Sequence, residues 1–287
     1  MRDARSDIDP AACAALRRAG GDRAIVGAIV LGSGLGRLLE RWRPFYTAAA
    51  ETIPGCPPAG VAGHAGGLAL IGSSREAVLV FPGRVHFYEG HNRAAVTYRV
   101  RLAAAVGARW LLLTNASGAV DPRVLPGTAL VIDDHVRLLL GPRAVRSRPA
   151  DAPGAQAVRL RGSPYHPGRT EEAFRCLSGA GLRTMRGVLF GGLGPSYETA
   201  AEVEMIRRLG ATAACMSTVI EAEEAARLGL EVVGLSLVTN LATGLAPSRL
   251  THEEVVAVGA QAGEKLAAGV AALVRGWLSA GEAGVRD

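Results

Sequence analysis

The segment AIVGAIVL at residues 24–31, followed directly by GSGLG at 32–36, decides the fold class of this chain. Its apolar run has the length of a buried β-strand, and the glycines allow a sharp turn into a following helix. Such a strand is typical of a layered α/β sheet that has helices on both faces. The turn has two possible interpretations, an anion cradle at a helix N-terminus or a simple tight turn, because it matches neither GxGxxG nor a Walker A loop.

Strand-like and helix-like segments alternate along the rest of the sequence. Further strands are expected at 68–71, 77–81, 110–114, 128–133, 187–192, 213–216 and 231–239. Helices are expected at 92–106, 170–177, 200–209, 221–228 and 251–278, the last with Thr251 as its N-cap. The first two of these strands would form a hairpin, and 110–114 would end at Asn115. No repeat or compositional break divides the chain, so we expect one domain at 23–280, an N-terminal extension or helix at 1–22 and a flexible tail at 281–287.

Composition and charge exclude several classes of protein. Hydrophobic residues make up 49% of the 287 residues, which is enough for a large core, but no apolar stretch is long enough to cross a membrane. The charged N-terminus lacks a signal-peptide pattern, so a cytoplasmic location is expected. The net charge of +6 comes almost entirely from scattered arginines, which argues against a nucleic-acid partner. The four cysteines are widely spaced and form no CxxC pair, which indicates reduced thiols.

The segment GRVHFYEG at 83–90 carries the densest group of functional side chains. Arg84 offers a planar fork of donors that suits phosphate or carboxylate. His86 and Tyr88 would project to the same side of an extended segment, whereas Glu89 would face away unless the glycines turn it back. This pattern predicts an anion site beside a polar, sugar-sized ligand. The alternative is a surface hairpin with solvated charges.

Other polar residues follow expected strands, at the edge where open α/β sheets bind ligands. TNASG at 114–118 offers backbone amides there, and Asn240 carries both a donor and an acceptor for a heteroatom edge. Glu198 could either cap the next helix or accept hydrogen bonds from a ligand. HEEVV at 252–256 lacks the second histidine of a zinc motif, and no GxSxG is present, so neither a metal site nor a nucleophilic serine is expected.

Nine segments, in order, resemble the trimeric purine nucleoside phosphorylases of the nucleoside phosphorylase superfamily. They are GSGLG at 32–36, GHAG at 63–66, GRVHFYEG at 83–90, TNASGAV at 114–120, DDHVRL at 133–138, GPSYETAAE at 194–202, MSTVIEA at 216–222, SLVTN at 236–240 and HEEV at 252–255. The resemblance implies an α/β fold, a three-layer α/β/α single domain with a mixed, twisted central sheet, and a homotrimer. It implies no cofactor, because inorganic phosphate is a co-substrate.

The resemblance also implies roles for individual residues. Phosphate would be held by Ser33, His64, Arg84, His86, the backbone amide of Ala116, and Ser217. The purine would be bound by Tyr197, Glu198 and Asn240, and the pentose by Tyr88, Met216 and His252. His86, Asn240 and Glu198 would take part directly in catalysis.

The implied reaction is phosphorolysis of purine nucleosides or 2′-deoxynucleosides to free base and pentose 1-phosphate, as in purine salvage. An amide at Asn240 can donate to O6, so inosine and guanosine are the expected substrates. Alternatives are a phosphorylase for a modified nucleoside or methylthioadenosine, a nucleosidase that uses water, and a non-catalytic nucleoside-binding homologue.

The chain departs from the family pattern at several positions. Tyr197 replaces a usual phenylalanine, Ile220 a usual proline, and Ser117 and Ala119 a usual alanine and glycine. The Pro- and Arg-rich segment 141–168 is expected to be a long loop, and it has no clear counterpart of the family aromatic that covers the pentose of the neighbouring subunit.

Overall fold

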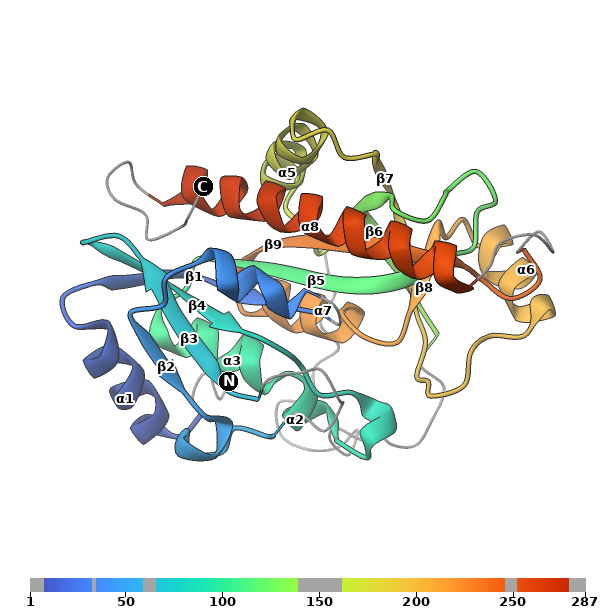
Figure 1. Cartoon of the computed structure of the whole chain (residues 1–287). Coiled ribbons are helices and arrows are strands. Elements are labelled where there is room, and N and C mark those ends of the chain that lie inside the picture. The colour runs from blue at the N-terminus through green and yellow to red at the C-terminus, as the bar shows by residue number, and fades with distance from the viewer. Residues whose placement is uncertain (1–7, 33–34, 59–65, 139–161, 246–251, 279–287) are drawn as a thin grey trace.

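The structure is a computed structural model that describes residues 8–32, 35–58, 66–138, 162–245 and 252–278 (Figure 1). Within these ranges, its centre is a nine-stranded mixed sheet in the order β2-β3-β4-β1-β5-β8-β7-β6-β9. The strands are β1 (Ala24–Val30), β2 (Tyr46–Ala48), β3 (Leu68–Gly72), β4 (Glu76–Phe81), β5 (Trp110–Ala119), β6 (Ala129–Arg137), β7 (Thr184–Gly191), β8 (Ala213–Cys215) and β9 (Glu231–Leu241).

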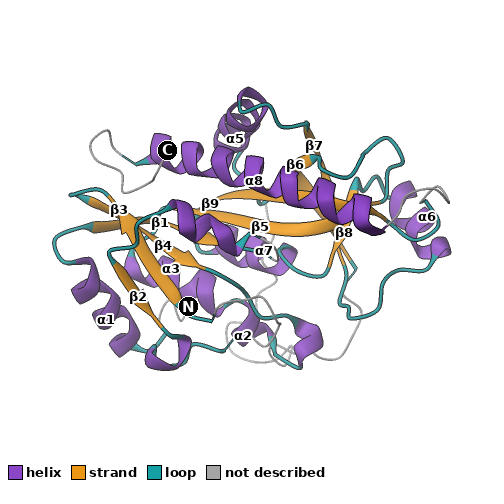
Figure 2. Cartoon of the chain, in the orientation of Figure 1, coloured by secondary structure: helices purple, strands orange, loops and turns teal. Residues whose placement is uncertain are grey.

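Helices cover both faces of this sheet (Figure 2). One apolar cluster joins the sheet to α1 (Pro10–Gly20), α3 (Tyr98–Val106) and α7 (Val219–Arg227). A second cluster on the other face joins it to α5 (Pro167–Gly179), α8 (His252–Trp277) and the 3₁₀ helix η2 (Gly36–Arg41). The remaining helical elements are α2 (Arg93–Val96), α6 (Ala200–Arg208), η3 (Ala50–Thr52) and η4 (Phe87–Glu89). The three-layer α/β/α fold with a mixed sheet is therefore confirmed. None of the helices in the described ranges is both long and apolar enough to cross a membrane.

Apolar side chains alternate between the two faces of the central strands, which explains why helices pack on both faces of the sheet. In β1, Ala28 and Val30 belong to the cluster under α1 and α3, whereas Ile29 belongs to the cluster under α8. The neighbouring β4 divides in the same way, with Leu79 on one face and Val80 on the other. Strands that are apolar on both faces are typical of a parallel sheet, and β1 does pair in parallel with β4 and β5.

Strand β5 is longer than predicted. The predicted strand 110–114 ended at Asn115, but β5 continues to Ala119 because it pairs with β9 along its whole length, from Trp110 opposite Glu231 to Ala119 opposite Leu241. The end of β5 also pairs with β8. Since β8, β7, β6 and β9 pair in turn, these four strands and β5 form a closed ring at one end of the sheet. The sequence contained no signal for this closure.

The other predicted elements are recovered with shifted ends. The hairpin of β3 and β4 is confirmed as an antiparallel pair. The predicted helix 92–106 is two helices, which meet at Thr97. Helix α5 begins earlier than predicted, at Pro167, because His166 caps it through a bond from the Arg169 amide to Nδ1 (3.3 Å). Thr251 and most of the predicted 141–168 loop lie outside the described residues.

A tight contact at Gly27 provides a test of this packing. A Cβ atom at Gly27 would overlap the ring of Trp110, which is 1% exposed and lies opposite Gly27 in the β1–β5 register. Gly27→Ala should therefore lower the free energy of unfolding by about 3 kcal/mol, at the upper end of the usual cost of overpacking. Thermal unfolding at fixed protein concentration measures this.

Gly20→Ala is the matched control, because a Cβ at Gly20 in α1 would meet nothing within 4 Å. Its stability should stay within about 1 kcal/mol of the wild type. Equal unfolding temperatures for the two variants would contradict the packing described for β1 and β5.

Candidate active site

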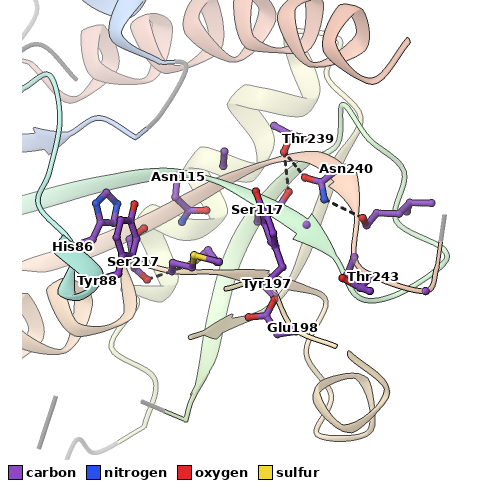
Figure 3. A pocket seen from close by; sticks show the side chains of 18 of the residues that line it. His86, Tyr88, Asn115, Ser117, Tyr197, Glu198, Ser217, Thr239, Asn240 and Thr243 are labelled. Atoms are coloured by element: carbon purple, nitrogen blue, oxygen red, sulfur yellow. Dashed lines mark hydrogen bonds between the residues drawn. The ribbon is translucent and has the colours of Figure 1, made fainter. Parts of the chain in front are cut away.

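A pocket of about 470 Å³ lies at the carboxyl ends of β5 and β9 (Figure 3). Segments that follow β4, β7 and β8 complete its walls. Because β1, β4, β5 and β9 run parallel, their carboxyl ends share one edge of the sheet, where open α/β sheets place ligands. Its lining residues are Arg84, His86, Tyr88, 115–118, Tyr197, Glu198, 214–217 and 239–244.

Arg84 brings a buried positive charge to one end of this pocket. It is 2% exposed, and its Nε donates to Glu221 Oε2 (3.0 Å) while Nη1 donates to the carbonyl of Thr114 (2.7 Å). The remaining nitrogen, Nη2, is buried and has no hydrogen-bond partner within the described ranges. Buried donors in proteins are almost always paired. The pocket therefore has a charged donor that an anionic ligand can satisfy.

His86 is held beside Arg84 by Glu89. The turn at η4 brings Glu89 back, so that its Oε1 lies 2.7 Å from His86 Nδ1 and also accepts from the His86 amide (2.7 Å). The 3₁₀ turn of η4, which ends at Gly90 (φ +92°), thus turns the carboxylate towards the histidine, and the extended segment expected from the sequence is wrong here. The imidazole stacks on the ring of Tyr88, with centroids 4.7 Å apart. With Nδ1–H bonded to a carboxylate, the imidazolium form can also donate from Nε2 to an anion.

A chain of buried polar side chains connects Ser217 to the strands behind the pocket. The Ser217 hydroxyl lies 3.2 Å from that of Thr218, which accepts from Asn115 Nδ2 (2.9 Å). Asn115 Oδ1 accepts from the Ser236 hydroxyl (2.5 Å), which is also 2.6 Å from the hydroxyl of Ser117. These bonds cross between β5 and β9 and fix Ser217 relative to both strands.

Asn240 and Glu198 lie at the other end of the pocket. Thr239 Oγ1 donates to Asn240 Oδ1 (2.9 Å), and Asn240 Nδ2 donates to the carbonyl of Leu241 (3.0 Å), which leaves the amide with a second hydrogen to donate. A Cβ at Gly118 would lie 3.1 Å from Asn240 Nδ2, and one at Gly192 would lie 3.1 Å from Glu198 Oε1. Glycine at these two positions therefore leaves room for both side chains.

The two interpretations of Glu198 can now be separated. The cap of α6 is Thr199, whose amide donates to Glu202 Oε2 (2.7 Å), so Glu198 is not needed as a cap. Glu198 instead lines the pocket, next to Tyr197, which is 79% exposed. Tyr197 thus presents most of its ring to solvent at the pocket wall.

Two pocket residues keep their protons at neutral pH. Burial raises the pKa of Cys215 to about 11, and burial also raises the pKa of Tyr88, with a smaller contribution from Glu89. Cys215 is therefore a neutral thiol rather than a nucleophile, and the Tyr88 hydroxyl can donate a hydrogen bond.

The structure brings most of the predicted site residues into one pocket. Those that line it are Arg84, His86, Tyr88, Ala116, Tyr197, Glu198, Met216, Ser217 and Asn240. Ser33 and His64 lie outside the described residues. His252 begins α8, but its side chain is likewise not described.

Several lining residues were not predicted individually, among them Asn115, Ser117, Thr239 and Thr243. The sequence indicates backbone amides of 114–118 at a ligand-binding edge, but it does not indicate a role for the side chains. The alternation of Asn115 and Ser117 along a longer strand was the missed signal. Glu221, the partner of Arg84, was missed because the two residues are 137 positions apart.

Comparison with known proteins extends this description. The family model described as "Phosphorylase superfamily" matches residues 24–275. The purine nucleoside phosphorylase of Mycobacterium tuberculosis is 37% identical to this chain over 276 residues, covering 93% of this chain and 97% of the relative.

Two solved structures of a Schistosoma purine nucleoside phosphorylase have a similar fold. The Schistosoma mansoni enzyme in complex with adenosine gives a TM-score of 0.75, and a schistosome enzyme in complex with hypoxanthine gives 0.79. Both are 27% identical to this chain, and each alignment covers 92% of this chain and 95% of the solved one.

Proposed function

The chain belongs to the phosphorylase superfamily and, within it, to the purine nucleoside phosphorylases, and we propose that it cleaves 6-oxopurine nucleosides with inorganic phosphate. One observation supports this most: a buried arginine, with a donor that has no partner in the part of the chain that the structure describes, shares a pocket with Asn240 and Glu198. One end of the pocket thus suits an anion, and the other suits a base with both donors and acceptors. The pathway is purine salvage.

Phosphate would bind at the end formed by Arg84, His86, the Ala116 amide and Ser217. Arg84 would give charge-assisted hydrogen bonds, and so would the imidazolium form of His86; such bonds are about twice as strong as neutral ones. Ser33 and His64, proposed as two further ligands, come from segments outside the described residues. The pentose would lie between the two ends, against Tyr88 and Met216, with His252 near its 5′-hydroxyl.

The chemistry requires no covalent enzyme intermediate. As the glycosidic bond breaks, the sugar becomes cationic at C1′ and the purine gains the electron pair of that bond. The phosphate dianion stabilises the sugar cation and then bonds to C1′, giving pentose 1-phosphate. The purine leaves as an anion and takes up a proton. Asn240 would donate more strongly to N7 as that atom gains charge, which is stronger binding of the transition state than of the ground state.

The Asn240 amide favours a 6-oxopurine. Because Thr239 donates to Oδ1, Nδ2 is the atom oriented towards a ligand acceptor, and O6 or N7 of hypoxanthine or guanine can accept from it. Glu198 would accept from N1–H of the same bases. Adenine has no N1–H for Glu198 and carries a donor at position 6, so Asn240 could donate only to its N7.

A substrate panel tests the proposed function. Initial rates with inosine, guanosine, adenosine and methylthioadenosine, each with and without phosphate, should show cleavage of inosine and guanosine only when phosphate is present. We expect kcat/KM for adenosine to be lower by about 100-fold, in keeping with unpaired polar groups at the base. Cleavage without phosphate would indicate a nucleosidase, binding without cleavage a non-catalytic homologue, and faster cleavage of methylthioadenosine a different specificity.

Gly194 offers a test of the proposed pentose surface. Its φ is +67°, and a Cβ there would lie 2.5 Å from Met216 Sδ and 2.8 Å from Tyr88 Cδ1. Gly194→Ala should therefore displace both side chains and raise the KM for inosine about 10-fold, with little change in the KM for phosphate. Steady-state kinetics at saturating concentrations of the other substrate measure the two constants.

Gly181→Ala is the matched control for backbone strain. Gly181 has φ +73°, but a Cβ there would meet nothing within 4 Å. Both variants should lose about 1–2 kcal/mol of stability, the usual cost of a left-handed conformation in a residue with a side chain. A similar KM for inosine in both would show that Met216 and Tyr88 do not form the nucleoside surface.

We also propose a homotrimer, a single domain over residues 23–280 and a cytoplasmic location, on the basis of the family resemblance and the sequence. The trimer is directly testable. Sedimentation equilibrium at micromolar concentration should give a mass about three times the 29.6 kDa of one chain. A monomer or dimer mass over the whole concentration range would exclude it.

A further inference from the structure

A single buried carboxylate, Glu221, is bonded to both walls of the anion end of the pocket. It lies in the first turn of α7 and is 1% exposed. Its Oε2 accepts from Arg84 Nε (3.0 Å) and from the backbone amide of Thr218 (3.2 Å). Arg84 comes from the segment after β4 and Thr218 from the turn after β8. One oxygen atom therefore joins two segments that are far apart in the sequence.

Thr218 has an unusual backbone conformation. Its φ is +72°, which is disfavoured for a β-branched residue, and among the described residues it alone has a positive φ without being glycine. Two bonds hold it in this state: its amide donates to Glu221, and its hydroxyl accepts from Asn115 Nδ2 (2.9 Å). The Ser217 hydroxyl, which lines the pocket, lies 3.2 Å from the Thr218 hydroxyl. The position of Ser217 therefore depends on the constrained turn at Thr218.

Glu221 also determines which part of Arg84 is available to a ligand. Its bond to Nε and the Thr114 carbonyl at Nη1 occupy two sides of the guanidinium, so among the residues that the structure describes Nη2 is the nitrogen left for an anion. Because the guanidinium is planar, fixing Nε and Nη1 also fixes the direction of Nη2. Without the Glu221 bond, the buried arginine could turn its fork to another acceptor.

We propose that Glu221 and Thr218 are positioning residues, which hold Arg84 and Ser217 at one phosphate ion and so determine its affinity without touching it. This inference rests on the proposed function. Glu221 cannot serve as a phosphate ligand itself, because a carboxylate has no hydrogen to donate and would repel the dianion. Its contribution is geometric, and it acts through the two groups bonded to it.

Glu221→Asp separates position from charge. The shorter side chain keeps the negative charge but withdraws the carboxylate by one methylene, so it cannot reach both Arg84 and Thr218. The KM for phosphate should rise about 10-fold, and the KM for inosine should stay within about two-fold. Glu221→Gln keeps the length of the side chain and removes the charge, and it should shift the KM for phosphate less than Glu221→Asp does. A larger shift in the glutamine variant would overturn the geometric role.

Glu224→Asp is the matched control. Glu224 lies on the same helix, is 6% exposed and pairs with Arg227 (2.5 Å), but it does not line the pocket. Shortening Glu224 should leave both KM values unchanged. It should still carry whatever loss of stability a glutamate-to-aspartate substitution causes in α7. An equal rise in the KM for phosphate in both aspartate variants would reduce Glu221 to a structural role and overturn the proposal.

Thr218→Val provides a second variant in case Glu221→Asp does not fold. Valine has nearly the same shape, but it loses the hydroxyl bonds to Asn115 and Ser217. The KM for phosphate should rise several-fold with little change for inosine. A phosphate KM within two-fold of the wild type in this variant would also overturn the proposal.

Calorimetric titration with inorganic phosphate alone distinguishes failure of the proposed function from failure of the positioning role. If the wild type neither binds phosphate nor requires it for cleavage, the proposed function fails. If the wild type binds phosphate and requires it, but Glu221→Asp binds it equally well, only the positioning role fails. The supporting result is wild-type binding together with about 10-fold weaker binding in Glu221→Asp.

Discussion

The pairing of β5 with three other strands is the constraint on which the rest of the structure depends. β5 lies beside β1 and β9 in parallel and meets β8 at its end. The Thr114 carbonyl on this strand accepts from Arg84, and Asn115 donates to Thr218, so Arg84 and the turn that carries Ser217 are both bonded to β5. Gly118, three positions further along, is opposite Asn240 in the β5–β9 register. One strand thus sets the distance between the phosphate end and the base end of the pocket.

Local sequence patterns were sufficient to predict much of this arrangement. The apolar runs at 24–31 and 231–239 predicted buried strands, and Arg84 and His86 could be recognised from their spacing between glycines. The end of β5 and the closed ring could not be predicted in this way, because a strand pattern does not reveal its partners. The same limit applies to Glu221, whose charge looks like that of any helix residue until Arg84 is placed beside it.

Several buried polar groups lie under the pocket. Asn115, Ser236 and Thr218 are nearly inaccessible to solvent, yet each is hydrogen-bonded. Within the described ranges, Arg84 Nη2 and Glu221 Oε1 are the exceptions next to the pocket, since neither has a partner. Fully paired groups give the floor a single arrangement, whereas the unpaired donor on Arg84 remains for the ligand. Because burying an unpaired charged donor is costly, an anion that accepts from Arg84 Nη2 would stabilise the site.

The closed ring of β5, β9, β6, β7 and β8 has a consequence for how a nucleoside could enter and leave. Each of these strands is hydrogen-bonded on both sides, so none can slide or tilt without breaking two ladders at once. A nucleoside therefore does not exchange through a gap opened between these strands. If the pocket opens, the movement has to come from the loops that connect these strands, such as the segment that carries the solvent-facing Tyr197. Evolution of a new specificity in this fold would accordingly alter those connections while the ring kept its hydrogen-bond pattern.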